Sequence, residues 1–247
     1  MILQVRNIKK FFGAKKILDD INFSIDAGEC VGIVGLSGCG KSTLAKIISR
    51  LIPCDDGHIF LCGEDITHAT GNYFYKNMQM IFQTPEDSFD PRKTLGWSIA
   101  EPLKNHHVKN ISERVKNLLL EVGLMPEYAT RYPHEVSGGE CQRAAIARAI
   151  SLEPKLLICD EATSALDVTV QAQVINLLKK LCREKKISCM FITHDLALLP
   201  RIADRVMVMH DGKIVEVGTP DKIINFPKSR FTKDLMATDF FAMNGGI

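Results

Sequence analysis

The chain has 247 residues, of which 46% are hydrophobic and 24% are charged, and its 31 basic residues nearly balance its 29 acidic ones. This apolar content excludes a mainly disordered chain, and the net charge of +2 gives no support to a dedicated nucleic-acid-binding protein. The sequence has no apolar run of about 18 residues that could cross a membrane, and its start lacks the layout of a signal peptide. We therefore expect one or two globular domains in the cytosol.

The eight cysteines fit that location if they are reduced. Most of them stand inside apolar segments, and no two form a Cys-x-x-Cys pair or a Cys/His cluster with zinc spacing. We expect them to be small buried side chains.

Short aliphatic and β-branched runs open the chain and predict β-strands over residues 3–8, 21–25 and 30–34. The apolar positions Leu44, Ile47, Ile48 and Leu51 follow with the i, i+3, i+4, i+7 spacing that predicts a helix over 42–51. Because strands and helices alternate along the rest of the chain as well, the pattern indicates an α/β fold.

A glycine-rich segment, residues 35–43, joins the third strand to the first helix and matches G-x-x-x-x-G-K-[ST]. Its glycines let consecutive backbone N–H groups face an anion, and the helix N-terminus adds partial positive charge. In such a loop the lysine reaches the β- and γ-phosphates, and the first hydroxyl ligates Mg²⁺. The candidate phosphate-binding residues are Gly35, Ser37, Gly38, Cys39, Gly40, Lys41, Ser42 and Thr43.

Residues 85–135 are more polar than their surroundings and carry helical rather than strand patterns. Within them, Ser112 is a candidate N-cap for a helix over 112–122. We expect this stretch to be a helical insertion into the α/β core. After it, Ser137, Gly138 and Gly139 precede a helix that we expect to begin near Glu140. They form either a second anion-binding helix end or an ordinary loop-to-helix cap.

The strand pattern returns at residues 155–159 and 188–193, on either side of an amphipathic helix around 170–181. Two further strands, over residues 205–210 and 213–217, flank Asp211-Gly212, which is a hairpin signal. The strand expected over residues 155–159 leads directly into Asp160 and Glu161. Since a buried parallel strand needs no carboxylates, these acids indicate a site at its carboxyl end. Asp160 suits Mg²⁺, and Glu161 suits a general base that orients water.

Together these segments resemble the ATP-binding cassette (ABC) family, the nucleotide-binding subunits of ABC transporters, over roughly residues 2–220. The resemblance implies a P-loop NTPase-type core with a mixed sheet, an N-terminal antiparallel β subdomain and a helical insertion subdomain. We expect the core and β subdomain over 1–84 and 155–220, the helical subdomain with the signature over 85–154, and a C-terminal tail over 221–247. The implied ligands are ATP and Mg²⁺.

The resemblance also assigns roles to residues that are weak signals alone. Gln83 contacts Mg²⁺ and the attacking water, and His194 is the switch histidine at the γ-phosphate. The aromatic that stacks on adenine is Phe12, with Phe11 as the alternative and a core role open for either. The residues implied to act on the ATP of a partner cassette are Ser137, Gly138 and Gly139 of the signature and Asp167 of the D-loop Ser164-Ala165-Leu166-Asp167.

The signature departs from the usual Leu-Ser-Gly-Gly-Gln, because Val136 and Glu140 stand at its ends. Valine for leucine changes packing only. Glutamate adds negative charge near a phosphate site but leaves the serine and glycines intact, so we expect activity to survive.

Further stretches resemble the dipeptide, oligopeptide and nickel importer subunits, among them residues 87–96, 101–103, 163–174 and 203–206. No cysteine follows Cys189, and the chain stops at Ile247. These two features favour the short nickel or metal-chelate type over the peptide type. The alternatives are a non-transport cassette ATPase of repair, translation or cluster assembly, and a regulatory nucleotide-binding protein without turnover, against which Glu161 argues.

An importer subunit implies partners, and none of them is a nucleic acid. The resemblance implies a second ABC ATPase subunit in a heterodimer, two transmembrane permeases and, indirectly, an extracytoplasmic solute-binding protein. The chain would then lie peripherally on the cytoplasmic face of the cell membrane. Residues 85–103 are the expected docking segment for a permease.

Overall fold

The computed structural model describes residues 1–69, 73–164 and 166–244. Its contacts separate the chain into two units: the first unit, Met1–Phe74 with Ser188–Ile247, and the second unit, Tyr75–Ile187. This division differs from the expected helical subdomain over 85–154, whose boundaries stay a prediction. Within the described ranges, no helix combines the length and apolar character that crossing a bilayer requires.

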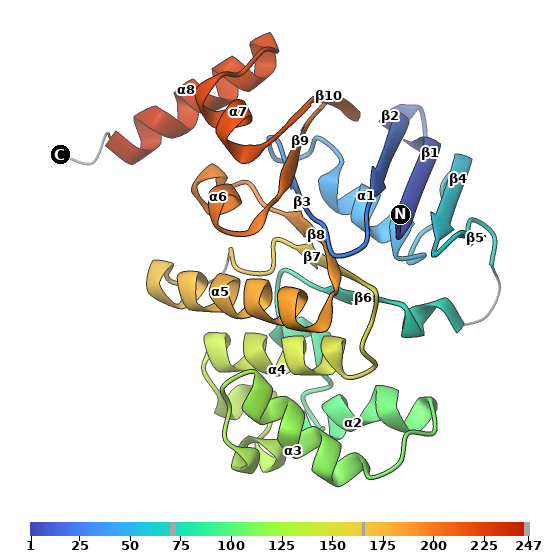
Figure 1. Ribbon diagram of the computed structural model, residues 1–247, viewed down its shortest axis with the longest axis vertical. Helices are drawn as coiled ribbons and strands as arrows, with labels where there is room; N and C mark the ends of the chain where they lie inside the picture. Colours follow the sequence, from blue (N-terminus) through green and yellow to red (C-terminus); the bar gives the residue numbers. More distant parts are fainter. Residues whose placement is uncertain (70–72, 165, 245–247) are drawn as a thin grey trace. The chain divides into compact units, whose positions relative to one another are not determined.

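An antiparallel sheet in the first unit has the order β2-β1-β4-β5, and Figure 1 shows its three long strands, β2, β1 and β4, side by side. The strands are β1 (Leu3–Phe12), β2 (Lys15–Ile25), β4 (Asp56–Leu61) and β5 (Glu64–Asp65). The expected strands at 3–8 and 21–25 therefore belong to longer ones.

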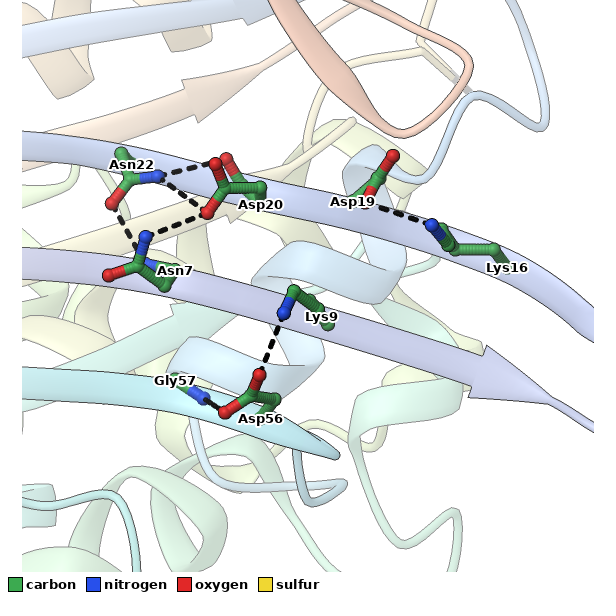
Figure 2. A network of polar contacts seen from close by, with 8 residues as sticks. All are labelled: Asn7, Lys9, Lys16, Asp19, Asp20, Asn22, Asp56 and Gly57. Atoms are coloured by element: carbon green, nitrogen blue, oxygen red, sulfur yellow. Dashed lines mark hydrogen bonds and ion pairs between the residues drawn. The ribbon is translucent and has the colours of Figure 1, made fainter.

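Polar side chains of β1 and β2 form hydrogen bonds where the apolar alternation of these strands breaks. The register shifts along the pair, and Asn7 and Asp20 have φ of 51° and 59°. Figure 2 shows how the irregularity is held: the Asn22 amide oxygen accepts the Asn7 backbone N–H at 2.8 Å, and Asp20 accepts the Asn7 side-chain amide. Lys9 and Asp56 join β1 to β4 at 2.9 Å. Such side-chain bonds satisfy backbone groups that a bulge leaves out of the ladder.

A mixed sheet in the first unit contains β3 (Cys30–Val34), β8 (Ser188–Ile192), β9 (Arg205–His210) and β10 (Lys213–Gly218). β3 pairs in parallel with both β8 and β9, and β10 pairs antiparallel to β9. Every residue of β3 and β8 is buried, which is typical of strands covered on both faces. The helices of this unit are α1 (Lys41–Ile48), α6 (Leu199–Ile202), α7 (Pro220–Asn225) and α8 (Arg230–Asn244), with a 3-10 turn η5 (Leu196–Leu198).

The second unit is mainly helical, with one parallel strand pair, β6 (Met78–Ile81) and β7 (Leu156–Asp160). Its helices are α2 (Leu95–Asn105), α3 (Ile111–Glu121), α4 (Gly138–Ile150) and α5 (Val168–Lys185), and its 3-10 turns include η2 (Glu86–Ser88), η3 (Pro126–Thr130) and η4 (Pro133–Glu135). A further turn, η1 (Tyr73–Lys76), lies at the boundary with the first unit.

The structure confirms the α/β class with a mixed sheet, an antiparallel sheet and a run of helices between Leu95 and Ile150. One detail is wrong: Ser112 is not an N-cap. The helix begins one residue earlier, after Asn110, whose φ of 55° already turns the chain into it. The eight cysteines are thiols; six are buried as expected, and Cys54 and Cys62 are half-buried.

Candidate functional site

The glycine-rich loop of the first unit connects the buried strand β3 to α1. Its glycines take backbone conformations that other residues avoid, with φ of 153° at Gly35 and 105° at Gly40. A Cβ on Gly35 would lie 2.2 Å from the Met209 carbonyl oxygen, and one on Gly40 would lie 2.8 Å from a Leu18 methyl. A Cβ on Gly38 would meet nothing within 4 Å. The loop is therefore packed on one side and open at Gly38.

The Lys41 side chain is 4% exposed and folds back under this loop. Its ammonium group donates to the carbonyl oxygens of Gly35 at 2.8 Å and of Leu36 at 3.0 Å. A buried ammonium group needs such acceptors, and an anion on the loop would add a full opposite charge.

The N-terminus of α1 is open to an anion. Its N-cap is Gly40, which has no side chain to accept a helix N–H, and its first turn contains no acidic residue. The first N–H groups of a helix have no partner within the helix, so an uncapped helix start suits phosphate oxygens. Ser42 and Thr43 lie half-buried in this first turn. The loop, Lys41 and the helix start together fit a nucleotide phosphate tail.

The β9–β10 hairpin contacts the glycine-rich loop, and the sequence did not predict this contact. The Gly212 N–H donates to the Cys39 carbonyl at 3.2 Å, and the Gly212 carbonyl accepts from Asp19 of β2 at 2.9 Å. The Asp-Gly pair predicted the hairpin but not its contacts with Cys39 and Asp19, which lie far away in the sequence. Burial also raises the pKa of the Cys39 thiol, so Cys39 is a packing residue of the loop.

His194 lies at the same edge of the first-unit sheet as the loop. Ile33 of β3 is opposite Ile192 of β8 in a parallel pair, so the residues two positions on, Gly35 and His194, both leave the carboxyl edge. The Thr193 N–H donates to the Ile33 carbonyl at 3.1 Å, which fixes this turn, and the His194 side chain is exposed.

Two phenylalanines end β1. Phe12 is 54% exposed and Phe11 39% exposed, so both rings can be approached by a ligand. Each has a lysine ammonium group over its face: Lys10 over Phe12 at 5.6 Å and Lys16 over Phe11 at 5.8 Å. The β1–β2 hairpin that carries them leads directly into Leu18, which contacts Gly40. The choice between the two rings as the adenine stacker stays a prediction.

The second unit brings Gln83 and Glu161 together at the carboxyl ends of its two strands. The Gln83 amide donates to the Glu161 carboxylate at 3.2 Å and to the Ser164 hydroxyl at 3.3 Å, and that hydroxyl donates to the Glu161 carbonyl at 3.0 Å. Asp160 is 6% exposed, and Glu161 has a φ of 48°, a conformation that is costly for a non-glycine residue. Sequence reasoning placed Ser164 in the D-loop and missed its part in this cluster.

The signature, residues 136–140, forms the start of α4. The helix begins at Gly138, two residues earlier than expected, and Ser137 is its N-cap. The Ser137 hydroxyl accepts the Glu140 N–H, and the Glu140 side chain bonds back to Ser137. A Cβ on Gly139 would lie 2.5 Å from a Val170 methyl of α5, whereas one on Gly138 would have only an ordinary contact with Leu166 at 3.7 Å. Gly139 is thus required by close helix packing.

Asp167 is the N-cap of α5, and its carboxylate accepts the backbone N–H groups of Thr169 at 3.1 Å and Val170 at 2.9 Å. This is a structural role that the sequence reasoning did not assign to it. Ala165 of the same D-loop lies outside the described residues.

Comparison with known proteins connects this geometry to a family. Residues 18–164 match the family model described as ABC transporter. The chain is 44% identical to the oligopeptide transport ATP-binding protein OppF of Salmonella typhimurium, over 96% of this chain and 77% of that protein.

Solved structures agree with the sequence comparison. A dimeric ATP-binding cassette in a post-hydrolysis state with ADP and Pi has a TM-score of 0.79 at 26% identity, over 89% of this chain and 99% of that one. CbiO1 of Clostridium perfringens, part of an ABC transporter complex, has a TM-score of 0.82 at 25% identity, over 98% of this chain and 95% of that one. The chain therefore belongs to the ABC transporter family of ATP-binding subunits, and it is an ATPase.

Proposed function

We propose that this chain powers a multi-subunit importer whose cargo is a peptide. The name of the OppF relative supports peptide cargo, and residues 87–96, 101–103 and 203–206 resemble both peptide-type and nickel-type importers. The absence of late cysteines is one feature that favours nickel or another metal chelate. That cargo has no support from the relative's name, so it becomes the alternative.

The observation that carries the proposal is the buried Lys41 ammonium group beneath an open glycine loop at an uncapped helix start. In the proposed function, residues 35–43 bind the ATP phosphates, and Phe12 or Phe11 stacks on adenine. The hydroxyl of Ser42, the carboxylate of Asp160 and the amide of Gln83 are oxygen donors, which suit Mg²⁺. When bound, Mg²⁺ neutralises negative charge on the phosphates.

Hydrolysis needs a base that orients water toward the γ-phosphate, and we assign this role to Glu161. Its carboxylate already accepts a hydrogen bond from Gln83, so the amide holds the carboxylate in one orientation. His194 would donate to the γ-phosphate, and Lys41 would stabilise the charge that develops on it.

The chain contains one phosphate loop and one signature, so we propose that two cassettes complete each other's sites. Ser137, Gly138, Gly139 and the D-loop Asp167 would then act at the ATP of the partner. By the resemblance, the partner is a second, different ATPase subunit. The assembly would include two permeases and, indirectly, a solute-binding protein, and would hold this chain on the cytoplasmic face of the membrane.

Uptake in the source cell tests this function. A strain that lacks the chain should lose import of a labelled oligopeptide, and the wild-type gene should restore import, whereas Lys41→Ala should not. Affinity purification of the chain should also bring down membrane permeases. Restored uptake of nickel instead of peptide would change the cargo, and the absence of any permease would favour the non-transport alternative.

A further inference from the structure

The start of α4 contains three polar side chains in series. The Tyr128 hydroxyl of η3 donates to Oε1 of Glu140. The other carboxylate oxygen of Glu140, Oε2, accepts the Ser137 N–H at 2.8 Å and the Ser137 hydroxyl at 2.9 Å. A single carboxylate thus connects Tyr128 to the signature serine through its two oxygens, and all three residues belong to the second unit.

This carboxylate presents a difficulty for the proposed role of Ser137. A serine hydroxyl has one proton to donate, and in this structure that proton goes to Glu140. A phosphate oxygen that binds Ser137 would compete for the proton, and its negative charge would lie close to the Glu140 carboxylate. Like charges at such short range oppose one another. A bare carboxylate at this position would therefore weaken phosphate binding.

The surroundings of Glu140 stabilise its ionised form. Hydrogen bonding from Tyr128 and from Ser137 lowers the pKa of Glu140, and the nearby Arg131 charge acts in the same direction. The Arg131 guanidinium group also lies over the Tyr128 ring, 4.3 Å from its centroid. The same hydrogen bond raises the pKa of Tyr128, so its hydroxyl keeps its proton and remains a donor to Glu140. The Tyr128 donor lies at Oε1, the carboxylate oxygen that does not bond to Ser137.

We propose that Tyr128 is a positioning residue for the signature, which holds Glu140 through Oε1 and thereby makes a carboxylate compatible with phosphate binding at Ser137. The inference rests on the proposed role of the signature and extends it to a residue outside that motif. Hydrogen bonds to an ionised group are about twice as strong as neutral ones. The need for the Tyr128 hydroxyl should therefore depend on the charge at position 140.

Glutamine at position 140 offers a matched test of that dependence. A tyrosine hydroxyl can donate to a carboxylate or accept from an amide, so Glu140→Gln keeps the shape of the network and removes its charge. Once the charge is gone, phosphate binding has no carboxylate to overcome. The hydroxyl of Tyr128 should then matter little.

A double-mutant cycle in the assembled transporter, purified through a tag on this chain, measures this coupling. Tyr128→Phe alone should raise the ATP concentration for half-maximal hydrolysis about fivefold, because a charge-assisted hydrogen bond is lost. Glu140→Gln alone should lower that concentration or leave it unchanged. In the Glu140→Gln background, Tyr128→Phe should change it by less than about twofold, as expected for a neutral hydrogen bond at a half-buried site.

The matched control is Tyr132→Phe, which removes a hydroxyl from a neighbouring ring whose residue bonds Glu135 through its backbone N–H. It should leave the half-maximal ATP concentration unchanged. Thermal melting of each variant separates misfolding from a change in phosphate binding. An equal effect of Tyr128→Phe in both backgrounds, or none in either, would overturn the inference. A wild-type complex without ATPase activity would overturn the proposed function itself.

Discussion

The helices α1 and α4 both start in glycine-containing sequence, but their N-terminal N–H groups are capped differently. α1 follows a glycine-rich loop, α4 begins with two glycines, and both are candidates for binding phosphate. At α1 the N-cap is Gly40, without a side-chain cap or an acid in the first turn. At α4 the N-cap is Ser137, and Glu140 completes a capping box. The first start has no side-chain cap, whereas at the second the capping box satisfies part of the helix's own N–H groups.

The two units also differ in how their other polar groups are hydrogen-bonded. The first unit presents an ammonium group under an open loop, while the functional polar groups of the second unit bond to each other, as Gln83 does to Glu161. We infer that the first unit provides ground-state binding of ATP. The second unit holds groups that act once the phosphates are in place. Variants in the two units should therefore separate binding from turnover.

The largest effect should come from Glu161→Gln. Removing a general base typically costs about a hundredfold or more in turnover, and glutamine keeps the size and the contact with Gln83. We expect ATP hydrolysis to fall by this factor while ATP affinity stays within about twofold, because the phosphate loop is untouched. Steady-state hydrolysis and a binding titration on the same preparation test this. Unchanged hydrolysis would remove Glu161 from the role of base.

Lys41→Ala should show the reverse order, with binding lost first. Removing a buried cation that meets the phosphates should weaken ATP affinity by about tenfold to a hundredfold, the range for a hydrogen bond between charged groups. Lys46→Ala, at an exposed position of the same helix, is the control and should bind ATP normally. Ser137→Ala should also leave ATP binding by the single chain unaffected. If Ser137→Ala weakened that binding as much as Lys41→Ala, the contrast between the two helix starts would fail.

Glycine substitutions test how tightly each helix start is built. Gly35→Ala would place a Cβ against the Met209 backbone at 2.2 Å in a φ region costly for alanine, and should destabilise the fold by roughly 3 kcal/mol. Gly139→Ala meets only a Val170 methyl, at 2.5 Å, and should cost about 1–2 kcal/mol. Gly138→Ala has ordinary contacts and should cost less than about 0.5 kcal/mol. Urea denaturation would rank the three, and a costly Gly138→Ala would contradict the packing at α4.

Much of the fold could be predicted because the apolar pattern is regular where elements are buried. Both expected strands over 30–34 and 205–210 have the observed bounds, and β3 is buried throughout. The pattern failed where polar side chains replace the ladder, as at Asn7 and Asp20 in β1 and β2. No local signal predicts such bonds, because they join residues that the fold brings together.

The sequence likewise predicted some parts of the candidate site and missed others. Local motifs predicted the phosphate loop and the acids at the carboxyl end of β7, because the residues that define each motif are adjacent in the sequence. The hairpin contact of Gly212 with Cys39 and the bond from Tyr128 to Glu140 depend on tertiary structure. The cap formed by Asp167 is local, and an aspartate just before a helix was a signal that could have predicted it. Glu140 looked like a simple departure from a motif, but the structure shows that it caps its own helix.

The smallest expected effect is the pH dependence of the stability that the capping box of α4 contributes. Hydrogen bonds from Tyr128 and Ser137 lower the pKa of Glu140 in the folded chain. A group whose pKa is lower when folded stabilises the protein above its unfolded pKa, and that contribution is lost as the pH falls through the folded pKa. Wild type should thus lose its stability advantage over Glu140→Gln on acidification below about pH 4, near the usual glutamate range.

Thermal melting of both proteins between neutral pH and the lowest pH that keeps them folded measures this loss. The difference in melting temperature should be small, because Glu140 is only half-buried and solvent screens its interactions. It should shrink steadily with acid, and Tyr128→Phe should reduce it at neutral pH. The helix start at α1 has no acidic cap, so Lys46→Ala should show no such dependence relative to wild type. A difference that grew on acidification would mean that the Glu140 carboxylate destabilises the start of α4.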